Sequence, residues 1–285
     1  KSMLINSISN ARLRVGNFSG VTVTKEEVFF KYKDYQIEII DLPGAYSLSD
    51  YTIEEKVTKD FLDNSDYDII LNVLDSTNLE RNLFLTSELL ALDKKMIIAL
   101  NMIDEANKES IKIDEKQLSK ILGKPCIKTS AAKNIGINDV LNAIVLKFED
   151  QKLPTKLIFS DVIEEEISNI SNLFEETGLK THDTYRQLAI KLIKENKQTY
   201  KIFHDEPIWI KLQPILTAAF EHIYLHYNTK NIEDIFNDEK FAFAKGAVTE
   251  TVRSKIITAK TITDKIDSFL IHKIFGLPIF LILMW

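Results

Sequence analysis

Short apolar runs alternate with amphipathic stretches along roughly the first half of the chain. Apolar runs of this length are typical of strands buried between two layers of helices, and they lie at residues 68–75, 96–100 and 125–129. Apolar positions with helical spacing lie between and after them, near 51–63, 80–92, 114–122 and 138–149. This order predicts a mostly parallel sheet covered by helices, with ligand-binding loops at the carboxyl ends of the strands.

A β-hairpin is predicted ahead of these strands. Residues 28–32 and 36–40 alternate or run apolar on either side of Lys33-Asp34, a pair suited to a tight turn. The second arm of the hairpin leads into Asp41-Leu42-Pro43-Gly44. The sequence therefore predicts a D-x-x-G loop at the end of a strand.

The pattern changes after Leu153-Pro154. Strand-like runs disappear, and long stretches with helical spacing follow at 161–177, 183–196, 207–227 and 232–260. We therefore expect an all-helical domain over residues 153–262, after an α/β domain over residues 1–152.

Two polar clusters in the helical region are interpreted as structural features and not as functional sites. The acidic run Glu164-Glu165-Glu166 is expected to be the solvated first turn of a helix, where negative charge favours the helix dipole. His222 and His226 stand four residues apart, a spacing that could bind a metal ion, but no third ligand is evident and a structural role is favoured.

Residues 263–285 are expected to form a juxtamembrane segment and the start of a transmembrane helix. The apolar stretch at 274–285 is shorter than the roughly 20 residues that cross a bilayer, so a buried helix end is the plain alternative. Cationic residues outnumber Asp264 and Asp267 ahead of it, as the positive-inside rule expects of a cytoplasmic flank: Arg253, Lys255, Lys260, Lys265 and Lys273.

Composition narrows the class of protein. A chain of 285 residues can form two domains, and its net charge of -6 argues against a nucleic-acid partner bound through a cationic face. The single cysteine excludes an internal disulfide and fits a reducing compartment. Cys126 is interpreted as a buried strand residue rather than a reactive thiol.

Asn101-Met102-Ile103-Asp104 follows the apolar run at 96–100 and has the form N-x-x-D. A carboxylate at Asp104 can accept hydrogen bonds from the ring N–H and the amino group of guanine, and adenine offers neither donor in that arrangement. Asn101 can brace the loop beneath the base. Thr129-Ser130-Ala131 follows the next apolar run and would lie under the guanine. Each motif alone is weak, but together and in this order they predict a guanine site.

Lys1-Ser2 resembles the last two residues of the phosphate-binding motif G-x-x-x-x-G-K-[ST]. In that motif the lysine reaches the β and γ phosphates and the hydroxyl binds Mg²⁺. Because the chain starts inside this motif and without Met, we expect a fragment that lacks the first strand and most of the P-loop.

Two further segments are predicted to contact the phosphates. Asp41 at the end of a strand can hold Mg²⁺ through water, and Gly44 lets its N–H approach the γ-phosphate, within a loop that includes Leu42 and Pro43. Upstream, the hydroxyl of Thr22 could bind Mg²⁺ when triphosphate is present, in the segment Gly20-Val21-Thr22.

These residues resemble the bacterial ferrous-iron transporter B family, FeoB. The segment at 14–23 is similar to the family's first switch, V-G-N-W-P-G-V-T-V, with Phe18 and Ser19 in place of Trp and Pro. The segments at 41–48 and 75–83 also match, and Gly276-Leu-Pro-Ile-Phe280 resembles the entry to the family's first membrane helix. The resemblance spans nearly the whole chain and is strongest before residue 150.

The resemblance implies a P-loop GTPase domain, a helical spacer that influences nucleotide release, and the start of a membrane helix. It implies GTP or GDP with Mg²⁺ as ligands, possible activation by K⁺, and Fe²⁺ as the substrate of the full-length protein. The implied partners are the protein's own transmembrane pore, a small cytosolic protein of the iron-uptake system, and further copies of the chain. Its implied location is the cytoplasmic face of the inner membrane.

The expected chemistry is attack of water on the γ-phosphate, helped by Lys1, Thr22 and Gly44. Many GTPases place Gln just after D-x-x-G, but Ala45-Tyr46 stands here, so slow intrinsic hydrolysis is expected. Water would be held by backbone around residues 18–24 or activated by a cation. Two alternatives remain open: a soluble ribosome-associated GTPase, which should carry a basic RNA-binding extension, and a non-catalytic interaction module.

Overall fold

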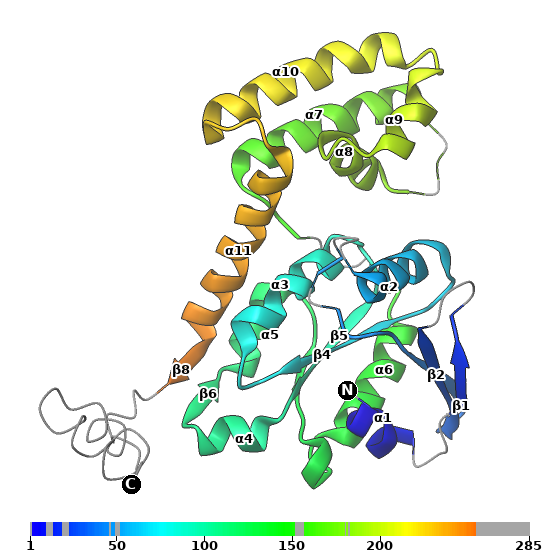
Figure 1. Cartoon of the computed structure of the whole chain (residues 1–285), viewed down its shortest axis with the longest axis vertical. Helices are drawn as coiled ribbons and strands as arrows, with labels where there is room; N and C mark the ends of the chain where they lie inside the picture. The colour runs from blue at the N-terminus through cyan, green and yellow to red at the C-terminus, as the bar shows by residue number, and fades with distance from the viewer. Residues whose placement is uncertain are drawn as a thin grey trace, which may run out of the picture.

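The protein has an α/β domain and a helical domain, joined by one long helix that runs from the second domain along the side of the first (Figure 1). The computed structural model describes residues 2–9, 14–18, 23–45, 47–48, 52–151, 157–179, 181 and 183–254. Within these ranges, no helix is both long and apolar enough to cross a membrane.

A parallel sheet forms the centre of the α/β domain. Its strands are β4 (Ile70–Asp75), β5 (Met96–Asn101) and β7 (Cys126–Lys128), in the order β4-β5-β7. The side chains from Met96 to Leu100 are fully buried, which confirms the strands predicted from apolar runs. Asp75 lies opposite Asn101 in the register, so the two polar residues end their strands at the same edge of the sheet.

Three antiparallel strands form a second sheet: β1 (Arg14–Asn17), β2 (Thr24–Tyr32) and β3 (Tyr35–Asp41). β2 and β3 form the predicted hairpin, and Lys33 at its turn has φ 53°. β3 and β4 lie in different sheets, and a groove of about 490 Å³ is lined by residues of both, including Ile37, Ile39 and Leu71.

Helices cover the sheets at the predicted places: α2 (Ile53–Asn64), α3 (Leu79–Leu90), α5 (Glu115–Leu122) and α6 (Ile137–Glu149). Local signals set their ends. Thr52 and Asp114 accept N-cap hydrogen bonds, and Gly123 ends α5 with φ 60°. α1 (Ser2–Ser9) follows Lys1 directly. The apolar pattern did not predict the six-residue α4 (Ile103–Lys108), which follows β5 directly.

The second domain is helical, as predicted. It contains α7 (Asp161–Thr177), α8 (Tyr185–Ile193), α9 (Lys197–His204), α10 (Trp209–Tyr227) and α11 (Ile232–Thr251). The single helix predicted over 183–196 is wrong at its end, because Glu195 takes a positive φ of 53° and Asn196 caps a new helix, α9. α9 carries Phe203 into the core, where its ring stacks on Phe174.

The helix predicted over 232–260 is also wrong beyond Thr251. There the chain becomes extended and forms β8 (Val252–Ser254), which pairs antiparallel with β6 (Ile111–Ile113) of the α/β domain. The backbone nitrogen of Asp114 donates to the carbonyl of Thr251 at 2.8 Å. The open edge of β6 provides hydrogen-bond partners that a further helical turn would not use. The predicted juxtamembrane and membrane segment beyond residue 262 lies outside the described residues.

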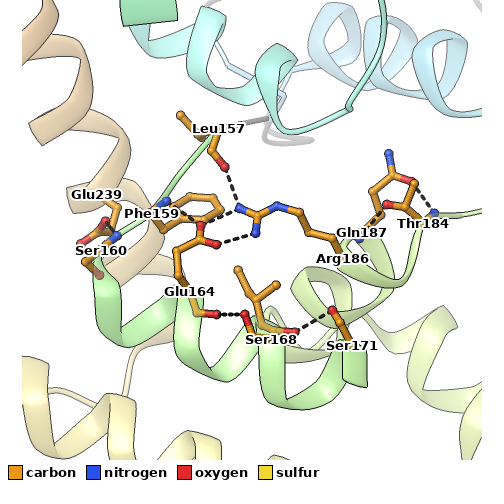
Figure 2. A network of polar contacts seen from close by, with 11 residues as sticks. Leu157, Phe159, Ser160, Glu164, Ser168, Ser171, Thr184, Arg186, Gln187 and Glu239 are labelled. Atoms are coloured by element: carbon orange, nitrogen blue, oxygen red, sulfur yellow. Dashed lines mark hydrogen bonds and ion pairs between the residues drawn. The ribbon is translucent and has the colours of Figure 1, made fainter. Parts of the chain in front are cut away.

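An arginine of α8 holds the segment that enters the helical domain (Figure 2). Arg186 donates to both carboxylate oxygens of Glu164, at 2.5 and 2.6 Å, and to the carbonyl of Leu157 at 2.7 Å. The same carboxylate accepts from the backbone nitrogen of Phe159 at 2.8 Å. The entry segment is thereby fixed to α7 and α8 together.

The acidic run at the start of α7 is therefore not simply solvated, which corrects the sequence-based interpretation. Glu164 pairs with Arg186, and Glu166 is buried and accepts from Nδ1 of His222 at 2.6 Å. Glu165 alone remains exposed. A sequence pattern does not show which partners a neighbouring helix supplies, and here α8 and α10 supply them.

Candidate nucleotide-binding site

Asn101 joins the ends of β5 and β7. Its Oδ1 accepts from the backbone nitrogen of Ala131 at 3.1 Å and from Oγ1 of Thr129 at 3.4 Å. The backbone nitrogen of Thr129 in turn donates to the carbonyl of Leu100 at 2.8 Å. The side chain of Asn101 thus braces the loop at 129–131 against the end of the central strand.

Asp104 lies in the first turn of α4, and its side chain is 9% exposed. A hydrogen bond from Ser130 lowers the pKa of this carboxyl, and a backbone N–H together with the charges of Lys133 and Lys108 lowers it further against the opposing effect of burial. Nζ of Lys133 lies 3.8 Å from Oδ2. Asp104 is therefore held as a carboxylate, the form that accepts hydrogen bonds from a guanine edge.

Backbone conformation positions this pair of loops. Met102 adopts φ 61°, which turns the chain from β5 directly into α4. After β7, Ser130 and Ile135 form an isolated antiparallel bridge, and Gly136 follows with φ 73°. A Cβ at Gly136 would lie 2.1 Å from the carbonyl oxygen of Lys128, so the turn requires glycine.

Asp41-Leu42-Pro43-Gly44 leaves the end of β3, as predicted, and is fastened to α2. Oγ1 of Thr58 donates to the carbonyl of Pro43 at 3.4 Å. Oγ of Ser47 donates to Oε1 of Glu55, a buried residue, at 3.2 Å. Gly44 is exposed, and a Cβ built on it would meet no described atom within 4 Å, so local crowding does not explain the glycine.

The segment at 75–83 is a structural link beside the loop that carries Asn101 and Asp104. Oδ1 of Asp75 accepts from the backbone nitrogen and the hydroxyl of Thr77, at 2.9 and 2.7 Å, which forms a tight turn after β4. The backbone nitrogen of Ser76 donates to the carbonyl of Asn101 at 2.9 Å. This distinctive motif supports the loop that carries Asn101.

The structure brings together one group of the predicted residues, namely Asn101, Met102, Asp104, Thr129, Ser130 and Ala131. Lys1, Gly20, Val21 and Thr22 lie outside the described residues, as does the side chain of Ser2, whose backbone starts α1. Sequence reasoning missed Lys133 and Gly136. The succession Asn134 and Gly136 before an apolar helix was a turn signal that could have indicated the second of them.

Comparison with known protein families decides the identity of both domains. The family described as ferrous iron transport protein B matches residues 1–144, and the FeoB cytosolic helical domain matches residues 159–253. The chain belongs to the FeoB family. The resemblance stated from the sequence motifs is thereby confirmed, as is a P-loop G domain with a parallel sheet followed by a helical domain.

Curated FeoB relatives are much longer than this chain. The Fe(2+) transporter FeoB of Helicobacter pylori strain J99 is 51% identical over 208 residues, which cover 73% of the chain and 31% of the relative. The Fe(2+) transporter FeoB of Campylobacter jejuni is 35% identical over 285 residues, which cover all of the chain and 35% of the relative. The chain thus spans about a third of the length of these FeoB proteins.

Solved FeoB structures share the arrangement of both domains. A mutant of S. thermophilus NFeoB bound to GDP is 34% identical with a TM-score of 0.76, and the match covers 89% of this chain and 95% of that one. The cytosolic domain of the T. maritima FeoB iron transporter in its GMPPNP form is 29% identical with a TM-score of 0.72, covering 89% and 94%. Both of those proteins carry guanine nucleotides or an analogue, by their descriptions.

Proposed function

We propose that the chain is the guanine-nucleotide-binding region of an Fe²⁺ importer and works at the cytoplasmic face of the membrane. The observation that carries this proposal is the convergence of two loops, in which Ser130 donates a hydrogen bond to Asp104 and Asn101 accepts one from the backbone nitrogen of Ala131. Membership of the FeoB family and the nucleotides bound by its solved relatives support it.

Base selection follows from hydrogen-bonding capacity. The carboxylate of Asp104 accepts from the ring N–H and the amino group of guanine, a charge-assisted pair that adenine cannot form. Asn101 holds the loop at Thr129-Ser130-Ala131 against the end of β5, where the loop would lie under the base. ATP should therefore bind far more weakly than GTP.

Hydrolysis of GTP is proposed to be slow. Water attacks the γ-phosphate while Lys1, the hydroxyl of Thr22 and the N–H of Gly44 stabilise the charge that develops on it. Ala45 stands where many GTPases place a water-orienting Gln, and it is buried, so it offers no such group. Backbone groups of residues 18–24, or a K⁺ ion, would orient the water instead.

The carboxylates at the start of β2 and the end of β3 fit a bound divalent cation. Glu26 and Asp41 are direct cross-strand partners, and Oε2 of Glu26 is buried with no hydrogen-bond partner among the described residues. Like charges placed opposite one another are destabilising unless a cation lies nearby. Asp41, with Ser2 and Thr22, would hold Mg²⁺, which neutralises charge on the phosphates.

The groove between β3 and β4 supports the proposal that a further strand completes the sheet in this domain. Its lining is largely apolar and includes residues of the two facing strands, such as Ile37, Ile39 and Leu71, as well as residues of the covering helices. A parallel strand in this place would pair with both edges and lead into a phosphate-binding loop before Lys1. On this proposal, residues 1–152 are a G domain without its first strand and most of its P-loop.

The remaining functions belong to the proposed full-length transporter. Nucleotide state would regulate or drive Fe²⁺ passage through the protein's own transmembrane pore, entered beyond residue 262. A small cytosolic protein of the iron-uptake system and further copies of the chain are proposed partners. No nucleic acid is expected, because the net charge is -6.

Isothermal titration of GTP, GDP and ATP tests the nucleotide proposal. The measurement compares the 285-residue chain with a form extended by the residues that precede Lys1 in the gene. We expect the extended form to bind GTP and GDP, to reject ATP, and to hydrolyse GTP slowly, and the shorter form to bind weakly or not at all. Equal affinity of the extended form for GTP and ATP would refute the guanine assignment, and micromolar GTP binding by the shorter form would refute the missing P-loop.

A further inference from the structure

Glu88 of α3 uses its two carboxylate oxygens to contact two separate parts of the molecule. Oε1 accepts from Nζ of Lys240, on α11 of the helical domain, at 2.6 Å. Oε2 accepts from the backbone nitrogen of Leu48 at 2.6 Å. Leu48 lies four residues beyond Gly44, so one carboxylate joins the helical domain to the segment that follows the D-x-x-G loop.

The ion pair is almost completely removed from solvent. Side-chain exposure is 6% for Lys240 and 11% for Glu88. Nζ of Lys240 also lies 5.5 Å from the ring centroid of Phe84, whose ring packs 4.5 Å from that of Phe241. Buried charges of this kind are costly without a partner, so neither residue can release the other freely.

A second lysine nearby shows how unfavourable unpaired positive charge is at this interface. Burial lowers the pKa of Lys194, the C-cap residue of α8, to about 8, and the positive charge of Lys240 lowers it further. Glu88 acts in the opposite direction on this pKa. Glu233 acts in the same direction as Glu88, so the carboxylate of Glu88 is one of two negative charges near the buried cations Lys194 and Lys240.

Two further polar contacts of the same segment lie inside the α/β domain. Thr58 of α2 donates to the carbonyl of Pro43, and Ser47 donates to Glu55 of α2. The contact between Glu88 and Leu48 differs, because the same carboxylate also contacts Lys240 of α11. α11 in turn leads into β8, which pairs with β6 of the α/β domain (Figure 1). A displacement of Leu48 would remove one of the two hydrogen bonds that orient Glu88, and so would reach Lys240.

We propose that Glu88 is a positioning residue through which the helical domain and residues 42–48 set each other's conformation. In the part that concerns nucleotide, the inference rests on the proposed function, because residues 42–48 include Gly44, which is expected to contact the γ-phosphate. Coupling of this kind is reciprocal: nucleotide that displaces Leu48 alters the hold on Lys240, and loss of Lys240 alters Leu48.

Amide hydrogen exchange of the nucleotide-free protein tests the coupling directly. Lys240→Met removes a charge that Leu48 does not touch, yet we expect the Leu48 amide to exchange about tenfold faster or more, because its acceptor loses its orienting partner. Lys240→Arg keeps the charge and should retain most of the protection. Lys245→Met, an exposed lysine on the same helix, is the matched control and should leave Leu48 unchanged.

Amide hydrogen exchange in β5 distinguishes a local effect on Leu48 from a general loss of stability. If Leu48 is unchanged in Lys240→Met, or if Leu48 and residues 96–101 accelerate by the same factor, the proposal is overturned. Glu88→Gln provides a second variant in case Lys240→Met does not fold. It should accelerate exchange both at Leu48 and around residue 240, and acceleration at Leu48 alone would count against the link to α11.

A non-hydrolysable GTP analogue tests the nucleotide part in the N-terminally extended form. In the wild type we expect exchange around residue 240 to change by about threefold or more on binding, and Glu88→Gln should abolish that change while the analogue still binds. Failure of the wild type to bind the analogue in calorimetry would refute the proposed function. Binding without any change around residue 240 would instead refute the coupling.

Discussion

Asn101 and Ala131 are separated by 30 residues in the sequence, and the side-chain oxygen of the first lies 3.1 Å from the backbone nitrogen of the second. This hydrogen bond joins the loops that follow β5 and β7. Asp104, the carboxylate proposed to read the base, lies in the same short region, where Ser130 donates to it. Protein groups alone make these contacts, and they hold the loops after β5 and β7 against one another.

Asp104→Asn should change which base is bound. The amide offers one donor and one neutral acceptor where the carboxylate offers two charged acceptors, so affinity for GTP should fall about thirtyfold or more. Xanthosine triphosphate should then bind better than GTP, because its 2-oxo group accepts from the new amide. Calorimetric titration of both nucleotides into the N-terminally extended form measures this exchange of preference. Unchanged GTP affinity would remove Asp104 from base recognition.

Glu166→Gln should lower the pKa of His222. The hydrogen bond to Glu166 raises this pKa above its ordinary 6.5, with burial opposing and the charges of Glu166 and Glu165 assisting. An imidazole whose pKa is raised on folding contributes stability below pH 6.5, which is lost as pH rises through the folded pKa. The difference in unfolding free energy between wild type and variant should therefore be larger at about pH 6 than at about pH 9.

NMR titration of the His222 ring checks the direction of this shift. Glu165→Gln is the matched control, because Glu165 is exposed and acts on His222 through charge without the hydrogen bond. Glu165→Gln should lower the pKa of His222 much less than Glu166→Gln does. Equal effects of the two substitutions would show that charge, and not the 2.6 Å hydrogen bond, controls the imidazole.

Arg186→Met should destabilise the helical domain by about 2 kcal/mol or more, because Glu164 and the carbonyl of Leu157 lose a charged donor in a site with little solvent. Lys191→Met is the matched control on the same helix. Its ion pair with Asp183 is exposed, so the loss should stay under about 1 kcal/mol. Urea denaturation of both variants measures the difference. Similar losses would mean that the Glu164 network does not anchor the entry segment.

The sequence allowed prediction of elements whose signals are local. The apolar run from Met96 to Leu100 had to be buried, and Lys33-Asp34 between two alternating segments indicated a hairpin. The N-x-x-D motif depends on its position after a strand, so it could also be located. Cys126 is a buried strand residue as expected, and burial raises the pKa of its thiol to about 12.

Features that depend on distant partners could not be predicted. The pairing of β8 with β6 joins short segments of three residues, and neither has a pattern that distinguishes it from a helix end or a loop. Glu88 and Lys240 are 152 residues apart, and each alone is an ordinary charged helix residue. Lys133 approaches Asp104 from the short turn at Ala131–Lys133 that follows β7, whereas Asp104 follows β5. The tertiary structure brings these residues together, and their spacing in the sequence does not predict the contacts.

Gly136→Ala should destabilise the α/β domain more than Gly178→Ala destabilises the helical domain. Both glycines have positive φ, 73° and 61°, so a Cβ costs strain of order 1 kcal/mol at either place. A Cβ at Gly178 meets nothing within 4 Å, whereas one at Gly136 would lie 2.1 Å from the carbonyl oxygen of Lys128. Because backbone cannot swing aside as a side chain can, β7 or the loop at 129–131 must shift, which should also weaken guanine-nucleotide binding in the N-terminally extended form. Urea denaturation and GTP titration of both variants measure the two effects, and equal destabilisation with unchanged GTP affinity would show that the turn at Gly136 can relax without disturbing the base site.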